Sequence, residues 1–221
     1  MFYYFIINPS SSSGKHKTLW REIREQLENE KIAYKVAVTK KTGDAKRLAR
    51  EASLQVSETN LCTVVAIGGD GTVNEVVNGL ILSPFLSFGY IPTGSGNDLA
   101  RGLGLSKEPL EALEFILHPK EKKAVRIGQI VTKNSEEEEG EKRRFVISSG
   151  AGFDAAVCHH SIQSKTKNML NFLRLGKLTY LFTALKLLMK YPYTKAELVL
   201  DNQEVKEYQR GILFSAFMNT C

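Results

Sequence analysis

The chain has little cysteine and no long hydrophobic run, and each shortage excludes a class of protein. Its 221 residues include three cysteines, Cys62, Cys158 and Cys221, and none belongs to a closely spaced metal-binding pair. Their odd number and wide spacing are typical of the reducing cytoplasm and not of a disulfide-stapled secreted domain. The nearest candidate for a membrane span, Leu178–Met189, is interrupted by Lys186 and is too short. We therefore expect a cytoplasmic protein that contacts a membrane only peripherally.

Positively charged residues are only slightly in excess over negatively charged ones. Lys and Arg total 30 and Asp and Glu total 24, which gives a net charge of +6. This excess fits a protein that meets anionic ligands or an anionic membrane surface, but it identifies neither. With 43% hydrophobic and 24% charged residues, the composition is that of a globular protein. The length allows one large or two small domains.

The first half of the chain alternates short apolar segments with segments of helical periodicity. The expected strands are Phe2–Ile7, Tyr34–Val38, Leu61–Ile67 and Phe88–Ile91. The helical signals are Leu19, Trp20, Ile23 and Leu27, then Ala45, Leu48, Ala49 and Ala52 after Gly43-Asp44, then Val73, Val76, Val77 and Leu80. This order predicts an α/β fold whose N-terminal domain is a doubly wound parallel sheet with helices on both faces. Ligands bind such sheets beyond the carboxyl ends of the strands, so the loops starting at Asn8, Thr39, Gly68 and Pro92 are the candidates.

The pattern changes near Lys120, and we expect a first domain over residues 1–122 and a β-rich domain over residues 123–221. The strand-like segments of the second part are Val125–Val131, Phe145–Ser149, Glu197–Leu200 and Ile212–Phe217. The acidic run Glu136–Glu139 fits a solvated hairpin tip. Leu170–Met189 has the spacing of an amphipathic helix, which predicts a helical insertion in the β-rich domain.

The segment from Gly68 to Thr72, with the sequence Gly-Gly-Asp-Gly-Thr, carries the strongest functional signal. It joins an expected strand to an expected helix, and its glycines leave backbone N–H groups open to phosphate oxygens. The helix N-terminus adds a favourable partial positive charge, and Thr72 with Glu75 has the spacing of a capping box. Asp70 would repel phosphate, and it is explained if it contacts Mg²⁺, a water or a hydroxyl group.

A second glycine-rich loop, Pro92–Asp98, follows the next expected strand. Ser95 offers a hydroxyl group, Asn97 can bridge loops, and the order of the sheet should place this loop beside Gly68–Thr72. A simple helix start would explain the second loop alone, but it does not explain both loops. Two similar patterns fail: Gly14-Lys15 lacks the Ser or Thr of a phosphate-binding P-loop, and Gly150–Ala155 has no β-α-β context for a dinucleotide.

On these residues the chain resembles the diacylglycerol kinase catalytic-domain family of soluble bacterial lipid kinases, which is related to sphingosine and ceramide kinases. Several pieces match in order. They are Asn8-Pro9 with the serine-rich turn to Gly14, Thr39 ahead of Gly43-Asp44-Ala45, Gly68–Thr72 with Asn74-Glu75, and Pro92–Asp98. The match is close in the first half and looser beyond it. The family fold implies an ATP-binding α/β domain over residues 1–122 and an incomplete C-terminal β-sandwich lipid-substrate domain over residues 123–221.

The resemblance implies transfer of the γ-phosphate of ATP to the hydroxyl of diacylglycerol or a similar lipid, with Mg²⁺. The implied nucleotide contacts are Asn8, Ser10, Ser11, Ser12, Thr39, Gly68, Gly69, Asp70, Gly71, Thr72, Val73, Asn74 and Ser95. Asp70 is the candidate catalytic residue and Mg²⁺ ligand. We expect a lipid partner at a membrane surface, guided into an interdomain cleft by Leu170–Lys190. A homodimer is a candidate assembly, and no nucleic-acid partner is expected.

One feature departs from the family pattern. The general base of the family is a carboxylate late in the second domain, after a further glycine-rich stretch. This chain ends at Met218–Cys221, where that stretch should begin, so we expect the base beyond Cys221. Asp70 could replace it in principle, and Asp98 and Asp154 are weaker candidates. Two alternatives stay open: an NAD kinase-like enzyme, which shares the Gly-Gly-Asp-Gly-Thr loop, and a non-catalytic nucleotide- or lipid-binding protein.

Overall fold

The computed structural model describes residues 1–12, 16–132, 140–153, 155–157, 185, 194–200, 204–211 and 213–217. The chain divides into two compact units, of which the first contains Met1–Ile147 and the second Ser148–Phe217. The domain boundary expected after residue 122 stays a prediction, and a hairpin that packs on the first unit explains why that unit continues to Ile147.

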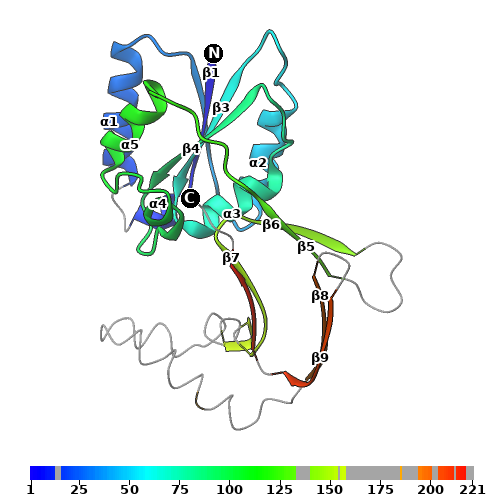
Figure 1. The fold of residues 1–221 in the computed structure, drawn as a ribbon. Helices are drawn as coiled ribbons and strands as arrows, with labels where there is room; N and C mark the ends of the chain where they lie inside the picture. The colour runs from blue at the N-terminus through cyan, green and yellow to red at the C-terminus, as the bar shows by residue number, and fades with distance from the viewer. Residues whose placement is uncertain are drawn as a thin grey trace. The chain divides into compact units, whose positions relative to one another are not determined.

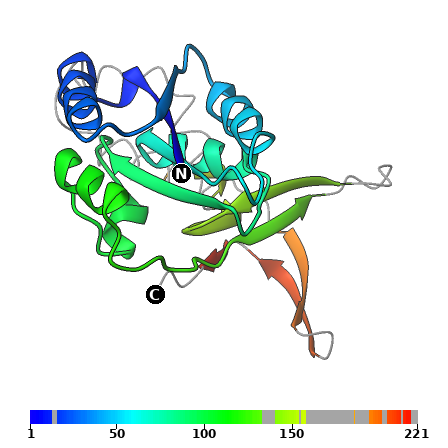
Figure 2. The ribbon, with the colours of Figure 1, turned by 90° about the horizontal axis from the view of Figure 1, so that it is seen from above.

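A parallel sheet forms the centre of the first unit (Figures 1 and 2). Its strands are β1 (Phe2–Ile7), β2 (Tyr34–Val38), β3 (Cys62–Gly68) and β4 (Leu86–Pro92), in the spatial order β2-β1-β3-β4. Each neighbouring pair is parallel. Every residue of β3 is buried, as expected of a central strand covered on both faces. The four strands predicted for the first half of the chain are thereby confirmed.

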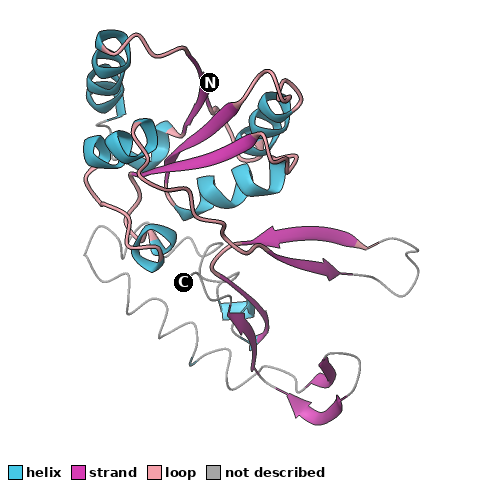
Figure 3. Ribbon diagram, turned by 45° about the horizontal axis from the view of Figure 1, so that its top comes forward, coloured by secondary structure: helices cyan, strands magenta, loops and turns pink. Residues whose placement is uncertain are grey.

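Helices cover both faces of this sheet, which confirms the doubly wound α/β class (Figure 3). The helices are α1 (His16–Asn29), α2 (Asp44–Ser53), α3 (Asp70–Gly79), α4 (Asp98–Gly102) and α5 (Pro109–Leu117), with a short 3₁₀ helix η1 at Pro9–Ser12. One core cluster joins α2 and α3 to side chains such as Ile6, Val64 and Ala66. The other joins α1 and α5 to Phe5 and Val65, which point to the opposite face.

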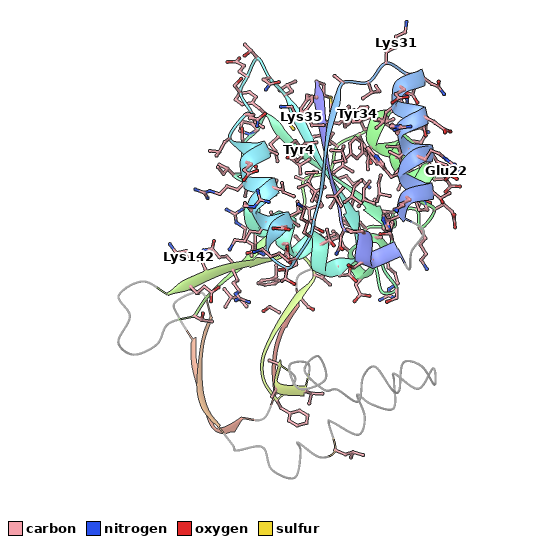
Figure 4. The ribbon with its side chains drawn as sticks, turned by 180° about the vertical axis from the view of Figure 1, so that it is seen from behind. Tyr4, Glu22, Lys31, Tyr34, Lys35 and Lys142 are labelled. Carbon is pink, nitrogen blue, oxygen red and sulfur yellow. The ribbon has the colours of Figure 1, made fainter. Side chains whose placement is uncertain are left out.

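Strand β2 lies at one edge of the sheet and shows the alternation of its side chains clearly (Figure 4). The ring of Tyr34 packs edge-on against Phe5 and Trp20, with centroids 6.3 Å and 6.0 Å away. The next side chain, Lys35, lies over the ring of Phe2, with its Nζ 5.6 Å from the ring centroid. This period of two is the one that the apolar pattern predicted for a strand.

A hairpin follows α5, formed by the antiparallel strands β5 (Gly128–Thr132) and β6 (Glu141–Phe145). The predicted strand Phe145–Ser149 is wrong in its bounds, because β6 ends at Phe145 and β7 (Ser148–Gly152) then begins. Strand β6 was not predicted from its sequence, Glu-Lys-Arg-Arg-Phe, because most of its side chains are exposed and little apolar alternation remains. The expected hairpin tip Glu136–Glu139 lies outside the described residues.

The described part of the second unit consists mainly of β-strands, with helical residues at 153, 155–157 and 185. Strand β7 pairs with β10 (Leu213–Phe217), and β8 (Thr194–Leu200) pairs with β9 (Glu204–Gly211), in both cases antiparallel. The predicted strand Glu197–Leu200 is confirmed as part of β8, and the predicted strand Ile212–Phe217 is confirmed from Leu213 onward as β10, with Ile212 outside the described residues. Strand β9 was not predicted. The β-sandwich itself stays a prediction.

Several predicted features fall on residues that the structure does not describe. The expected helix Leu170–Met189 lies outside the described residues, apart from Leu185, which is helical and exposed. Asp154 and the pair Cys158 and Cys221 also lie outside them. Within the part of the chain that the structure describes, no helix is both long and apolar enough to cross a membrane.

Candidate functional site

The loops that follow β1, β3 and β4 are tied together at the carboxyl end of the sheet. The backbone N–H of Asn8 donates to the carbonyl of Ile67 at 2.9 Å, which joins the first loop to the end of β3. The N–H of Thr93 donates to the carbonyl of Gly68 at 2.8 Å, which joins the third loop to the second. The sequence predicted that these loops lie side by side, and the hydrogen bonds confirm it.

Asn8 and the serines after it form the first loop of the site. The Asn8 Nδ2 donates to Thr72 Oγ1 at 2.9 Å, and its Oδ1 accepts from the Ser10 N–H at 3.0 Å. The hydroxyl of Ser11 donates to the carbonyl of Asn8 at 2.8 Å and lies 2.7 Å from Thr93 Oγ1. These side chains therefore hold the loops in place, and the exposed Ser10 side chain leads toward solvent. The side chain of Ser12 lies outside the described residues.

The two glycine-rich loops touch backbone to backbone. A Cβ built on Gly69 would lie 3.3 Å from the Gly94 Cα, and a Cβ on Gly94 would lie 2.7 Å from the Gly69 Cα. Gly68 is equally confined, because a Cβ there would lie 2.3 Å from Thr72 Oγ1. Real Cβ atoms essentially never come within 3.0 Å of another heavy atom, so Gly68 and Gly94 cannot be replaced without a shift of their neighbours, whereas a Cβ on Gly69 needs only a few tenths of an ångström.

The second loop leads into the N-terminus of α3. The helix begins at Asp70, with Gly69 as the N-cap residue in an extended conformation. The first N–H groups of a helix have no partner within it, and the helix dipole favours an anion there. Gly71 is exposed, and a Cβ on it would meet nothing within 4 Å, which leaves space beside the first turn of α3. The N–H groups of Thr72 and Val73 already donate to the Gly69 carbonyl, at 2.9 Å and 3.1 Å, so a phosphate oxygen would use the N–H groups that precede them.

The predicted capping box is wrong. Thr72 is buried inside the first turn of α3, where its Oγ1 accepts the hydrogen bond from Asn8. Glu75 reaches a different helix, because its Oε2 accepts from the Ala45 N–H in the first turn of α2 at 3.2 Å. The spacing of the two residues suggested a cap three positions too late, since the helix starts before Thr72.

Asn97 stabilises the third loop, Pro92–Asp98, and has a left-handed backbone with φ of 51°. Its Oδ1 accepts from the Tyr90 hydroxyl and from the Gly94 N–H, both at 3.1 Å, and its Nδ2 donates to the Gly94 carbonyl at 2.8 Å. Asn97 thus shapes its own loop, in contrast to the predicted bridge between loops. Tyr90 was missed because its position inside an apolar strand gives no sign of a hydroxyl role. Ser95 is exposed on the same loop.

The remaining predicted residues differ in what their side chains can reach. Thr39 is half-buried at the end of β2, with its N–H donating to the Ile7 carbonyl at 2.9 Å. Val73 is 1% exposed and belongs to the core, and its N–H donates to the Gly69 carbonyl at 3.1 Å. Asn74 is exposed on α3, and its Oδ1 accepts from Asn78 Nδ2 at 3.3 Å.

Comparison with known families decides the class of the protein. The family model of the diacylglycerol kinase catalytic domain matches residues 3–130. This chain belongs to the diacylglycerol kinase catalytic-domain family. The match contains the parallel sheet from Tyr3 onward together with the loops at its carboxyl end, and it confirms the resemblance drawn from the sequence motifs.

Similar proteins carry names of the same kind. The diacylglycerol kinase of Bacillus subtilis (strain 168) is 30% identical over 200 residues, which cover 90% of this chain and 59% of that protein. A diacylglycerol kinase of Staphylococcus aureus is 32% identical over 169 residues, which cover 75% of this chain and 48% of that protein. The chain thus spans between about half and three fifths of these relatives. A diacylglycerol kinase structure from Bacillus anthracis has the same fold, with a TM-score of 0.58 and 23% identity, covering 96% of this chain and 62% of that chain.

In this member of the diacylglycerol kinase catalytic-domain family, two carboxylates flank Gly96. A Cβ on Gly96 would lie 3.0 Å from Asp70 Oδ2 and 3.9 Å from Asp98 Oδ1. Asp70 Oδ1 also accepts from the Leu99 N–H at 3.4 Å. Burial, and then the charges of these two carboxylates, raise the pKa of the Tyr90 hydroxyl, which keeps it a hydrogen-bond donor. Carboxylate oxygens are ligands that Mg²⁺ accepts, so Asp70 fits that ion, whereas Asp98 Oδ1 is already paired with the Arg101 guanidinium.

A second cluster of metal-type side chains lies on other elements of this kinase-family chain. Among the described residues, the ligand atoms of Glu30, Glu114 and His118 lie within 4.8 Å of one another, and all three residues are exposed. His118 Nε2 lies 2.8 Å from Glu30 Oε2, and Gln26 Nε2 donates to both glutamates. These hydrogen bonds, first from Gln26 and then from His118, lower the pKa of Glu30. They explain the cluster as a polar contact between α1 and α5.

Proposed function

We propose that this chain is the nucleotide-binding part of an ATP-dependent lipid kinase, which transfers the γ-phosphate of ATP to the hydroxyl of diacylglycerol or a similar lipid. The observation that carries the proposal is the junction of the three loops around the open N-terminus of α3. It supplies backbone N–H groups and a positive dipole end, which suit the phosphates of a nucleotide. The lipid acceptor is proposed from the names of the relatives.

Phosphoryl transfer needs positioning and charge neutralisation more than covalent chemistry from the protein. The N–H groups at the start of α3 would hold phosphate oxygens, and the contact of Gly69 with Gly94 fixes the distance between the loops. The bond from Asn8 to Thr72 keeps the first loop against α3. Mg²⁺, when bound, would be held by Asp70 and would neutralise charge on the phosphates.

The proposal extends to the setting of the reaction. A lipid acceptor has to be met at a membrane surface, so we place the protein in the cytoplasm with peripheral membrane contact. A homodimer remains part of the proposal, and sedimentation velocity of the purified protein measures it directly. The general base that activates the lipid hydroxyl is assigned to no residue of this chain.

The test is an assay of the natural full-length protein with ATP, Mg²⁺ and three acceptors offered separately: diacylglycerol, sphingosine and NAD. Phosphorylation of a lipid supports the proposal. Formation of NADP supports the alternative of an NAD kinase-like enzyme and refutes the lipid acceptor. Nucleotide binding without turnover on any acceptor supports the alternative of a non-catalytic binding protein.

Asp70→Asn separates the role of the carboxylate from its place in the fold. The amide keeps the shape of the side chain and an oxygen that can still accept from the Leu99 N–H, so the melting temperature should stay near that of the wild type. Loss of the charge should lower lipid phosphorylation by at least about a hundredfold. Glu22→Gln, on the exposed face of α1, is the matched control and should keep full activity (Figure 4). Near-normal turnover of the Asp70 variant contradicts the assigned role.

A further inference from the structure

The hairpin strand β6 is bonded to the C-terminal end of α3, the helix whose N-terminal end carries the Gly-Gly-Asp loop. The amide of Asn78 uses both of its functions on the backbone of Arg144. Its Nδ2 donates to the Arg144 carbonyl at 2.9 Å, and its Oδ1 accepts from the Arg144 N–H at 2.8 Å. Asn78 therefore pairs with Arg144 as a neighbouring strand would.

The guanidinium of Arg144 completes this contact. Its Nη1 donates to the carbonyl of Leu80 at 2.6 Å and to the carbonyl of Val77 at 3.2 Å. Carbonyls at the end of a helix have no partner within it, and a cation there also complements the helix dipole. The hydrogen bonds are partly buried, so water competes with them less than at an open surface.

The apolar side chains beside this contact make the hairpin part of the core of the first unit. Val146 is 8% exposed and belongs to the same cluster as Val76 and Val77 of α3. Ile127 and Ile147, at the base of the hairpin, pack against that cluster. The chain then enters β7 at Ser148, so Arg144 fixes the chain to α3 immediately before the second unit begins.

We propose that Asn78 and Arg144 are positioning residues that set the direction of α3 and thereby the place of the nucleotide loop at its other end. The proposal rests on the proposed function, because it takes that loop as the phosphate site. Helix α3 has 10 residues and is therefore about 15 Å long. A tilt of about 4° at its C-terminal end moves the N-terminal end by roughly 1 Å, and a misplacement of that size costs about a hundredfold in a phosphoryl-transfer site.

The test compares Arg144→Met with Arg143→Met in the full-length protein. Arg143 is the neighbouring exposed arginine, and its Nε pairs with Glu141 Oε1 at 2.9 Å, so it controls for the loss of one charge from β6. We expect Arg144→Met to weaken ATP binding, measured by calorimetry well below the melting temperature, at least about tenfold, whereas Arg143→Met leaves it unchanged. Arg144→Lys should recover part of the affinity. Asn78 bonds the backbone of Arg144, which Arg144→Met keeps, so adding Asn78→Ala to Arg144→Met should weaken binding further.

Hydrogen exchange without nucleotide tests the same inference independently. The amide of Val76 should exchange faster in Arg144→Met than in the wild type, because the helix has lost its anchor. If the wild type binds ATP and Arg144→Met binds it equally well, the inference is overturned. Unchanged exchange of the Val76 amide in Arg144→Met overturns it as well. If the wild type binds no ATP, the proposed function fails instead, and the exchange rates alone decide whether Arg144 anchors α3.

Discussion

Replacing Gly94 by alanine separates the two glycine-rich loops by an amount that the structure fixes. The added Cβ would lie 2.7 Å from the Gly69 Cα and 2.9 Å from Asn97 Oδ1, whereas ordinary van der Waals contact begins at 3.4 Å. The backbone of Gly69 cannot turn away as a side chain does, so the loops must part by about 0.7 Å or more. Overpacking of this kind costs about 1–3 kcal/mol of stability.

The functional effect should exceed the effect on stability. A displacement approaching 1 Å in the loops that hold the phosphates should lower lipid phosphorylation by about tenfold to a hundredfold, while most of the protein stays folded. Steady-state kinetics with ATP and diacylglycerol, together with thermal unfolding, measure both quantities. Wild-type turnover in a folded Gly94→Ala variant would show that the contact between the loops does not position the nucleotide.

Two further predictions concern the frame around the site. Gly79→Ala should destabilise the protein by about 3 kcal/mol in urea unfolding, because the new Cβ would lie 2.0 Å from the Lys46 carbonyl oxygen. Wild-type stability of this variant would refute the tight crossing of α2 and α3. The carboxylate of Asp44 accepts the N–H groups of Lys40 and Lys41, and these bonds lower its pKa below the usual 3.8. Because the pKa is lower in the folded state, the charged carboxylate stabilises the fold above the pKa of the unfolded state, and this stabilisation is lost as the pH falls through the folded pKa. Asp44→Asn should therefore lower the melting temperature at about pH 7 and much less at about pH 2. An equal loss of melting temperature at both pH values would contradict this sign.

The parallel sheet could be predicted because its local signals are strong. The apolar segments Phe2–Ile7 and Tyr34–Val38 coincide with β1 and β2, and the periodic segments between the strands coincide with helices. Strands β6 and β9 could not be predicted, because Glu141–Phe145 and Glu204–Gly211 are rich in charged and polar residues. Their strand conformation depends on pairing with β5 and β8, which the composition of a single segment does not indicate.

The site could be predicted as a set of loops but not as a set of contacts. Parallel order places the carboxyl ends of β1, β3 and β4 together, so the meeting of Asn8 with the glycine-rich loops follows from the topology. The partner of Thr72 did not follow, because Asn8 is 64 positions away in the chain. Arg144 lies 66 positions from Asn78, and no local pattern announces a pair so distant.

The affinity of Gly71→Ala for ATP measures whether the phosphates lie at the start of α3. Gly71 is exposed in the first turn of α3, and a Cβ there meets nothing within 4 Å, so the fold should tolerate alanine or gain up to about 1 kcal/mol. A methyl group at this place would stand between the helix N-terminus and a phosphate. We expect a melting temperature at or above that of the wild type and an ATP affinity at least about tenfold weaker in calorimetry. Wild-type ATP affinity in this variant would contradict the placement of the phosphates at the start of α3.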